Sequence, residues 1–190
     1  MSGRRAPSRI ASWILFCAAA SHCLAAPPQS KTKSPAKTPA ADPAVIDQQG
    51  FRELLKRYRG KPLLVNFWAT WCQPCHEEYP MINELARQYA PQGLVVLGIS
   101  FDEDAEITLV RHFLARHKPV FLNYRKRPGN EEAFLKAVHP KWSGTLPATF
   151  FFSRDGRERT HLTGPHSRAE FENAIRAVLE TGAGTDSPGH

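Results

Sequence analysis

Two short apolar runs constrain the fold of this chain most. Residues 63–68 (LLVNFW) and 94–99 (LVVLGI) are continuous and rich in β-branched and aromatic side chains, which is typical of strands buried on both faces of a sheet. Each run precedes a stretch with helical spacing, over 74–90 with a kink expected at Pro80 and over about 104–117. This strand–helix–strand order predicts parallel pairing and an α/β sheet.

The rest of the chain extends this pattern. Strands expected at 148–152 and 158–163 flank Asp155-Gly156, a strong hairpin signal. The other expected elements are helices over 50–59 and 130–138, a short strand over 119–122, and a final helix capped by Ser167. We therefore predict a central mixed sheet with helices on both faces and an antiparallel hairpin at one edge.

The ends of the chain differ in composition from its centre. Residues 1–26 have a basic start and an apolar run over 10–20 before small residues, which is typical of an export signal. Eleven apolar residues fall short of the roughly 20 needed to span a bilayer, although an uncleaved anchor stays open. The domains expected are a signal peptide or anchor (1–26), a Pro/Ala/Lys-rich linker (27–43), a folded domain (44–181) and a disordered tail (182–190).

The charge of the chain gives little support to nucleic-acid binding. The formal net charge is +7, and removal of the signal with Arg4, Arg5 and Arg9 leaves a mild +4. The densest basic run is 125–127 (RKR). We interpret this run as a solvent-exposed face, with a docking patch for an acidic partner as the alternative.

Four cysteines are present, of which Cys17 and Cys23 belong to the predicted signal. The remaining two, Cys72 and Cys75, would close a very small loop that adds little stability, so their value must be chemical. Cys72 is expected at a helix N-terminus, where free N–H groups and the helix dipole favour an exposed thiolate. Cys75 would be shielded one turn further on and would resolve a mixed disulfide.

The residues around the cysteines leave other interpretations open. Trp71 would offer an apolar docking surface, and Pro74 suits the first helical turn. With His76, the segment also satisfies the C-x-x-C-H pattern of c-type haem attachment. A metal-delivery module or an inert disulfide are further alternatives. We expect no cofactor and no metal site, because the other histidines lack paired helical spacing; they are His112, His117, His139, His161 and His166.

Two segments resemble the thioredoxin superfamily. Asn66–Cys75 (NFWATWCQPC) resembles its active-site segment, and Thr145–Phe150 (TLPATF) resembles the segment with its cis-proline. The resemblance covers about residues 44–181 and implies a thioredoxin-like fold. It also implies a cis Leu146–Pro147 bond beside the cysteines, with the Leu146 backbone forming hydrogen bonds to a bound peptide.

One departure narrows the resemblance. Thioredoxins proper have a buried Asp where this chain has Asn66, and a carboxylate occurs instead at Glu78. This arrangement is similar to the TlpA/ResA-like exported reductases, including those that serve cytochrome c maturation. The similarity implies proton transfer by Glu78 at Cys75; a solvated Glu78 is the alternative. Glu77 is expected to face water.

The similarity also implies the biological setting. We expect a monomeric thiol–disulfide oxidoreductase, periplasmic or otherwise exported, that reduces disulfides of client proteins and receives electrons from a membrane thiol-reductant donor. Cys72, Cys75 and Glu78 would be catalytic, while Trp71, Pro74, Leu146 and Pro147 would contact the client. The sequence does not set the direction of electron flow, because potentials of such dithiols span about 150 mV.

Overall fold

The computed structural model describes residues 42–180 of the 190-residue chain. The predicted signal or anchor, most of the linker and the predicted tail lie outside these residues. The elements in chain order are β1 (Ala44–Ile46), α1 (Gln48–Arg57), β2 (Leu63–Trp68), α2 (Gln73–Tyr89), the 3-10 turn Ala90–Gln92, β3 (Val95–Ser100), the 3-10 turn Asp104–Glu106, α3 (Ile107–His117), β4 (Leu122–Lys126), α4 (Glu131–Val138), β5 (Ala148–Phe152), β6 (Glu158–Thr163) and α5 (Arg168–Glu180).

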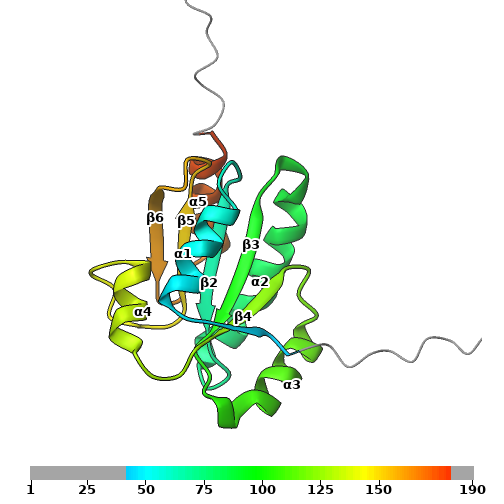
Figure 1. Ribbon diagram of the computed structural model, residues 1–190. Coiled ribbons are helices and arrows are strands. Elements are labelled where there is room, and N and C mark those ends of the chain that lie inside the picture. The colour runs from blue at the N-terminus through cyan, green and yellow to red at the C-terminus, as the bar shows by residue number, and fades with distance from the viewer. Residues whose placement is uncertain (1–41, 181–190) are drawn as a thin grey trace, which may run out of the picture. The chain divides into compact units, whose positions relative to one another are not determined.

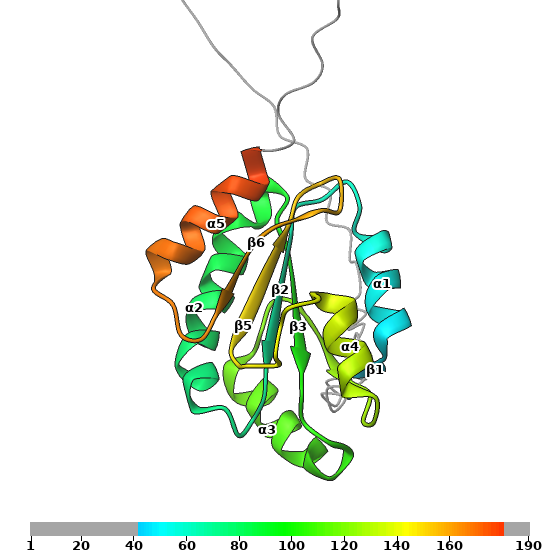
Figure 2. The ribbon, with the colours of Figure 1, turned by 90° about the vertical axis from the view of Figure 1, so that its left-hand side faces the viewer.

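The six strands form one mixed sheet in the order β1-β4-β3-β2-β5-β6 (Figure 1). The first four strands of this order pair in parallel, and β5 pairs antiparallel with both β2 and β6. The apolar run of β2 is buried at every position, because β2 is an inner strand and helices cover both faces of the sheet (Figures 1 and 2). The predicted α/β class and the closing hairpin are confirmed.

Helices cover both faces of the sheet. α2 and α5 lie on one face and α1 and α4 on the other, while α3 lies at the end of the sheet where β2 ends (Figures 1 and 2). The core is accordingly divided into two clusters. One contains Phe51, Phe67 and Phe134, and the other contains Ile82 and Phe171.

Side-chain caps define several helix starts. The Asp47 carboxylate accepts a hydrogen bond from the Gly50 N–H at 2.9 Å, and the Asn130 side chain accepts one from the Ala133 N–H at 3.2 Å. Ser167 and Glu170 form a reciprocal pair at the start of α5, with the Ser167 N–H donating to the glutamate at 2.8 Å. The predicted cap at Ser167 is confirmed.

Two elements at one edge of the sheet differ from the prediction. β1 was not expected, and β4 begins at Leu122, where the predicted strand over 119–122 ends. The β4 residues, LNYRK, have no apolar run and owe their strand conformation to parallel pairing with β3 and β1. Tertiary pairing overrides the local pattern at this edge.

The interpretation of the basic run as a solvent-exposed face was wrong for two of its three residues. Arg125 and Lys126 are buried, with Lys126 only 2% exposed. The Arg125 guanidinium pairs with Asp104 at 2.5 Å. The Lys126 ammonium lies over the Phe101 ring, 5.4 Å from its centroid, and 4.0 Å from carboxylates of Glu103 and Glu131. These partners compensate the burial of charge.

Within residues 42–180, no helix combines the length and the apolar character required to cross a membrane.

Candidate active site

The site begins where the central strand β2 ends. Residues 69–72 lead from this buried strand into α2, and Cys72 is the N-cap residue of that helix. The Cys75 N–H donates to the Cys72 sulfur at 3.3 Å, and Pro74 lies in the first turn, where an N–H has no helical partner. Cys72 and Cys75 are joined by a disulfide, with their Cα atoms 5.3 Å apart.

The two cysteines are similarly buried in this disulfide form. Cys72 is 5% exposed and Cys75 is 2% exposed, and both belong to the core cluster around Phe67. The expectation of an exposed Cys72 is therefore wrong for the oxidised state, because the sulfur packs against the core as well as against its partner. Trp71, by contrast, is 61% exposed beside the disulfide, as expected of a docking surface.

Glu78 is a buried carboxyl group on the same helix as the cysteines. It is 6% exposed and accepts a hydrogen bond from the His166 backbone N–H at 3.3 Å. Burial raises the pKa of Glu78 to about 7, and the His166 contacts oppose this shift only in part. The alternative of a solvated Glu78 is wrong, whereas its neighbour Glu77 is exposed as predicted.

Glu78 and Cys75 are three residues apart on α2, a spacing that places side chains on the same face of a helix. A carboxyl group with a pKa near 7 can both accept and release a proton at neutral pH. The site therefore combines a disulfide at a helix N-terminus with a titratable group one turn away.

His76, the histidine of the C-x-x-C-H pattern, is only partly exposed. Its Nε2 lies 2.7 Å from the Thr70 carbonyl oxygen, and its ring packs edge-on against Phe113 with centroids 4.8 Å apart. Beside it is a pocket of about 230 Å³, lined by Thr70, His76, Leu109, His112, Phe113 and Arg116.

These contacts do not favour covalent haem attachment. Both sulfurs are already bonded to each other, and the His76 Nε2 faces a backbone carbonyl. The adjacent pocket is also smaller than the roughly 300–1,000 Å³ typical of sites for larger ligands. The C-x-x-C-H pattern alone could not distinguish the two uses of the same spacing.

The Leu146–Pro147 segment lies next to the end of β2. The peptide bond between these residues is cis, as the resemblance implied. Pro147 directly precedes Ala148, which pairs with Phe67 of β2, two residues before Ala69. In the described part of the chain, neither the N–H nor the C=O of Leu146 has a hydrogen-bond partner. These groups are available to an extended peptide.

Asn66 occupies the position of the carboxylate that thioredoxins proper have. It is buried on β2, and its Nδ2 donates to the Thr149 Oγ1 at 3.0 Å. The Asn66 Oδ1 has no partner among the atoms of residues 42–180. Asn66 carries an uncharged amide. Of positions 66 and 78, therefore, only position 78 carries a carboxyl group.

A buried aspartate supports the loop before Cys72. The Asp102 carboxylate follows β3 and accepts from the Thr70 backbone N–H at 3.0 Å, from the Thr70 hydroxyl, and from the Ser100 hydroxyl at 2.5 Å. We did not predict these roles. The signal available was an Asp just beyond the carboxyl end of a parallel strand, next to the strand that leads to the cysteines.

Replacing Asp102 with Ala should lower the free energy of unfolding by about 2 kcal/mol, because the partly buried donors of Thr70 and the buried hydroxyl of Ser100 lose their acceptor. Urea denaturation of the oxidised protein measures this change. Asp102→Asn is the matched control and should cost less, since it keeps one acceptor oxygen. A loss below about 0.5 kcal/mol for the Ala variant, the range of ordinary surface changes, would count against the role.

Comparison with known proteins identifies the family. The profile of the AhpC/TSA family matches residues 36–159, well over half of the chain. The chain belongs to the AhpC/TSA family. It is 30% identical over 148 residues to the thiol-disulfide oxidoreductase ResA of Geobacillus kaustophilus, covering 78% of this chain and 80% of that one. It is 37% identical over 123 residues to the thiol:disulfide interchange protein DsbE of Pseudomonas fluorescens, covering 64% and 62%.

Solved structures agree on the fold. A thioredoxin-family thiol:disulfide interchange protein from Chlorobium tepidum superimposes with a TM-score of 0.56 at 24% identity, over 65% of this chain and 83% of that one. A solution structure of a thioredoxin-like protein from Neisseria meningitidis gives the same TM-score at 21% identity, over 71% and 83%. The fold is thioredoxin-like, and this member of the AhpC/TSA family is a thiol–disulfide oxidoreductase.

Proposed function

We propose that the enzyme works as a reductase of disulfides in exported client proteins. The Cys72 thiolate attacks a client disulfide and forms a mixed disulfide, releasing one client sulfur as a thiolate. Cys75 then attacks Cys72, which releases the second client thiol and leaves the Cys72–Cys75 disulfide. Two electrons pass from the enzyme to the client. The Cys75 N–H directed at the Cys72 sulfur, together with the start of α2, supports Cys72 as the attacking group.

The buried carboxyl of Glu78 is the observation that carries this proposal. In its protonated form the carboxyl group can donate a proton. In its ionised form it can accept the proton of the Cys75 thiol before that sulfur attacks. The ionised Glu78 carboxylate also repels negative charge on the sulfurs of Cys72 and Cys75, which makes a thiolate there less stable. Because a less stable thiolate makes the dithiol form less favourable, Glu78 should lower the reduction potential and favour electron donation.

The client is proposed to bind across Trp71 and the cis-proline segment. Trp71 is exposed next to Cys72, and Leu109 is an exposed apolar side chain that lines the pocket beside His76. The free backbone groups of Leu146 could pair with an extended client segment, and Pro147 and Pro74 would limit the approach to the sulfurs. This arrangement supports contact with many unrelated sequences, because backbone pairing does not depend on side-chain identity.

The reduction potential of the Cys72–Cys75 couple tests the proposal. We expect a value more negative than about −200 mV, together with catalysis of insulin reduction. Equilibration with glutathione or dithiothreitol buffers, followed by thiol alkylation, measures the potential. A value near −120 mV, typical of a strong oxidant, would reverse the proposed direction.

The proposal extends to the location of the enzyme. We propose that residues 1–26 direct export, that 27–43 form a linker to the domain at 44–181, and that 182–190 form a tail. Clients would include disulfide-bonded proteins such as those of cytochrome c maturation, and the electron donor would be a membrane thiol reductant. The intact mass of protein recovered from the periplasmic or membrane fraction distinguishes a cleaved signal from a retained anchor; recovery only from the cytoplasm would contradict export.

A further inference from the structure

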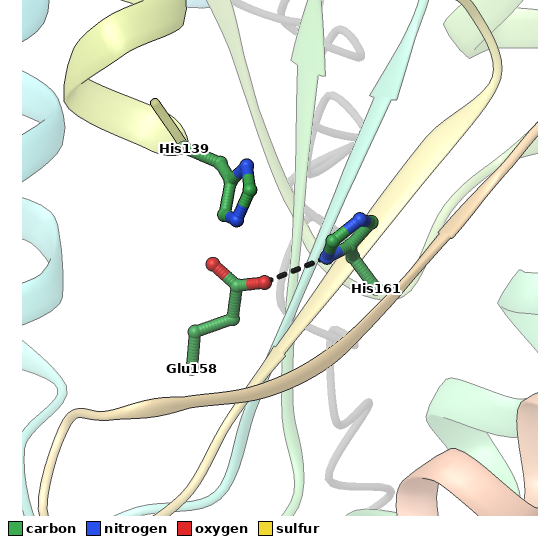
Figure 3. A group of neighbouring side chains, drawn as sticks. All are labelled: His139, Glu158 and His161. Carbon is green, nitrogen blue, oxygen red and sulfur yellow. Dashed lines mark hydrogen bonds and ion pairs between the residues drawn. The ribbon is translucent and has the colours of Figure 1, made fainter. Parts of the chain in front are cut away.

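A second cluster of chemically competent side chains lies outside the active site. His139 follows the last residue of α4, and Glu158 and His161 belong to β6. One donor atom from each lies within 4.8 Å of the other two. Figure 3 shows all three side chains directed into the same space between α4 and the sheet. His139 and Glu158 are half-buried, and His161 is exposed.

A β-bulge creates this arrangement. Residues three apart on a regular strand point to opposite faces of a sheet. In β6, however, Phe152 pairs with Glu158 and Phe151 pairs with Thr160, so one extra residue is accommodated between them. The bulge returns Glu158 and His161 to the same face, the face that carries Phe150 and Phe152. Bulges re-aim side chains in this way, and they are over-represented next to functional sites.

The three side chains are held by their surroundings. The His161 ring stacks on Phe150 with centroids 5.1 Å apart, and its Nδ1 lies 2.8 Å from a Glu158 carboxylate oxygen. The His139 ring lies 4.8 Å from the His161 ring. Its Nδ1 accepts the Lys141 backbone N–H at 3.2 Å, so Nε2 is the nitrogen turned toward Glu158 (Figure 3).

Nearby positive charges do not compete for the Glu158 carboxylate. The guanidinium groups of Arg157 and Arg159 pair with Asp155, at 3.7 and 3.6 Å. Among residues 42–180, the ion-pair partner of Glu158 is His161. The cluster therefore offers two imidazoles and one carboxylate.

We propose that His139, Glu158 and His161 bind a divalent transition-metal ion of the zinc class. Two imidazoles and a carboxylate form a recurrent three-ligand set for Zn²⁺, with a fourth position left for water or another ligand. Imidazole nitrogens favour zinc, copper or nickel over the hard ions magnesium and calcium. The ion would join the end of α4 to the edge strand β6 and act as a clip on this side of the domain.

Binding requires modest local changes. Ligand atoms around a tetrahedral Zn²⁺ lie about 3.3 Å apart, so the most separated donors must approach by side-chain rotation. The ion replaces the hydrogen bond between His161 and Glu158. Coordination by the His139 Nε2 also moves the ring hydrogen to Nδ1, which ends the contact with the Lys141 N–H. These costs favour moderate affinity over the very tight binding of a preformed site.

Zinc titration of the tag-free protein in its disulfide form tests the proposal, because oxidised Cys72 and Cys75 cannot act as thiolate ligands. Calorimetry should show one Zn²⁺ bound per chain at this cluster, and Mg²⁺ should not bind there. The variants His139→Gln, Glu158→Gln and His161→Gln should each weaken zinc binding at least about tenfold. His112→Gln removes an exposed histidine outside the cluster and should leave binding unchanged.

The outcomes separate a site from general histidine affinity. No zinc binding below about 100 µM, or unchanged binding in all three ligand variants, would overturn the proposal. Equal losses in His112→Gln would assign binding to a diffuse surface and overturn it as well. Circular dichroism without zinc establishes that each variant is folded, and a zinc-dependent rise in Tm should occur in the wild type and be reduced in the ligand variants. Zinc binding is compared only among variants that are folded without zinc.

Discussion

The Cys75→Ser variant should accumulate mixed disulfides with client proteins through Cys72. Without the resolving thiol, the adduct formed by the first attack cannot collapse to the Cys72–Cys75 disulfide. Turnover of insulin should fall to the uncatalysed rate, a loss of at least about 10²-fold given the size of typical nucleophile contributions. Non-reducing electrophoresis and mass spectrometry of the trapped adducts measure this result.

Cys72→Ser is the matched control for the trap. It removes the attacking sulfur at the N-cap and keeps Cys75, which lies within the first turn of α2. This variant should therefore yield few adducts. Equal trapping by both variants would show that the two sulfurs are interchangeable and would contradict the assignment of Cys72 as the nucleophile.

The Glu78→Gln variant should slow resolution of the mixed disulfide about 10²-fold near pH 7, because an amide cannot exchange protons with the Cys75 thiol. The rate of the wild type should have an inflection near pH 7, the pKa to which burial raises Glu78, and the variant should lack it. Stopped-flow measurement of single turnovers between pH 5 and 9 provides both results. Glu77→Gln, an exposed neighbour, is the control.

The same substitution should change the pH dependence of stability. The folded protein holds the Glu78 proton up to a pKa of about 7, whereas the unfolded chain releases it near 4.5. The stabilisation is present below pH 4.5 and is lost as pH rises through 7, by about 3 kcal/mol in total. Relative to the wild type, Glu78→Gln should gain stability from pH 5 to pH 8. Urea denaturation measures the difference in the free energy of unfolding between the variant and the wild type. A difference that stays constant from pH 5 to pH 8 would contradict the burial of the Glu78 carboxyl group.

Much of the fold could be predicted from local patterns. Apolar runs identified β2 and β5, and helical spacing identified α2 and α5, because these elements bury whole faces against the core. The same patterns could not predict β1, which has three residues and pairs with a strand almost eighty residues later in the chain. Such short edge strands depend on tertiary contacts alone.

Part of the active site could also be predicted from the sequence. The spacing of Cys72 and Cys75 and the position of Glu78 on their helix were readable from the sequence. Asp102 was missed because its contacts with Thr70 join segments 32 residues apart. Arg125 and Lys126 were wrongly predicted to be solvent-exposed, because their burial depends on carboxylates and a ring supplied by other elements.

The His139, Glu158 and His161 cluster was missed for another reason. Helical spacing was the criterion applied to histidines, whereas these side chains meet through a bulge in β6 and the end of α4. A bulge leaves no residue signature that distinguishes it from regular alternation in a single sequence.

The division of the core into two clusters allows redox properties and thermal stability to evolve separately. The cysteines belong to the cluster that contains Phe51 and Phe67, while Phe171 and Ile175 of α5 belong to the other cluster. Substitutions at distant, non-contacting positions have nearly independent effects. Relatives of this enzyme can therefore adapt to heat or cold through substitutions at Phe171 and Ile175 of α5 without retuning their electron transfer, and redox properties can diverge while thermal tolerance stays constant.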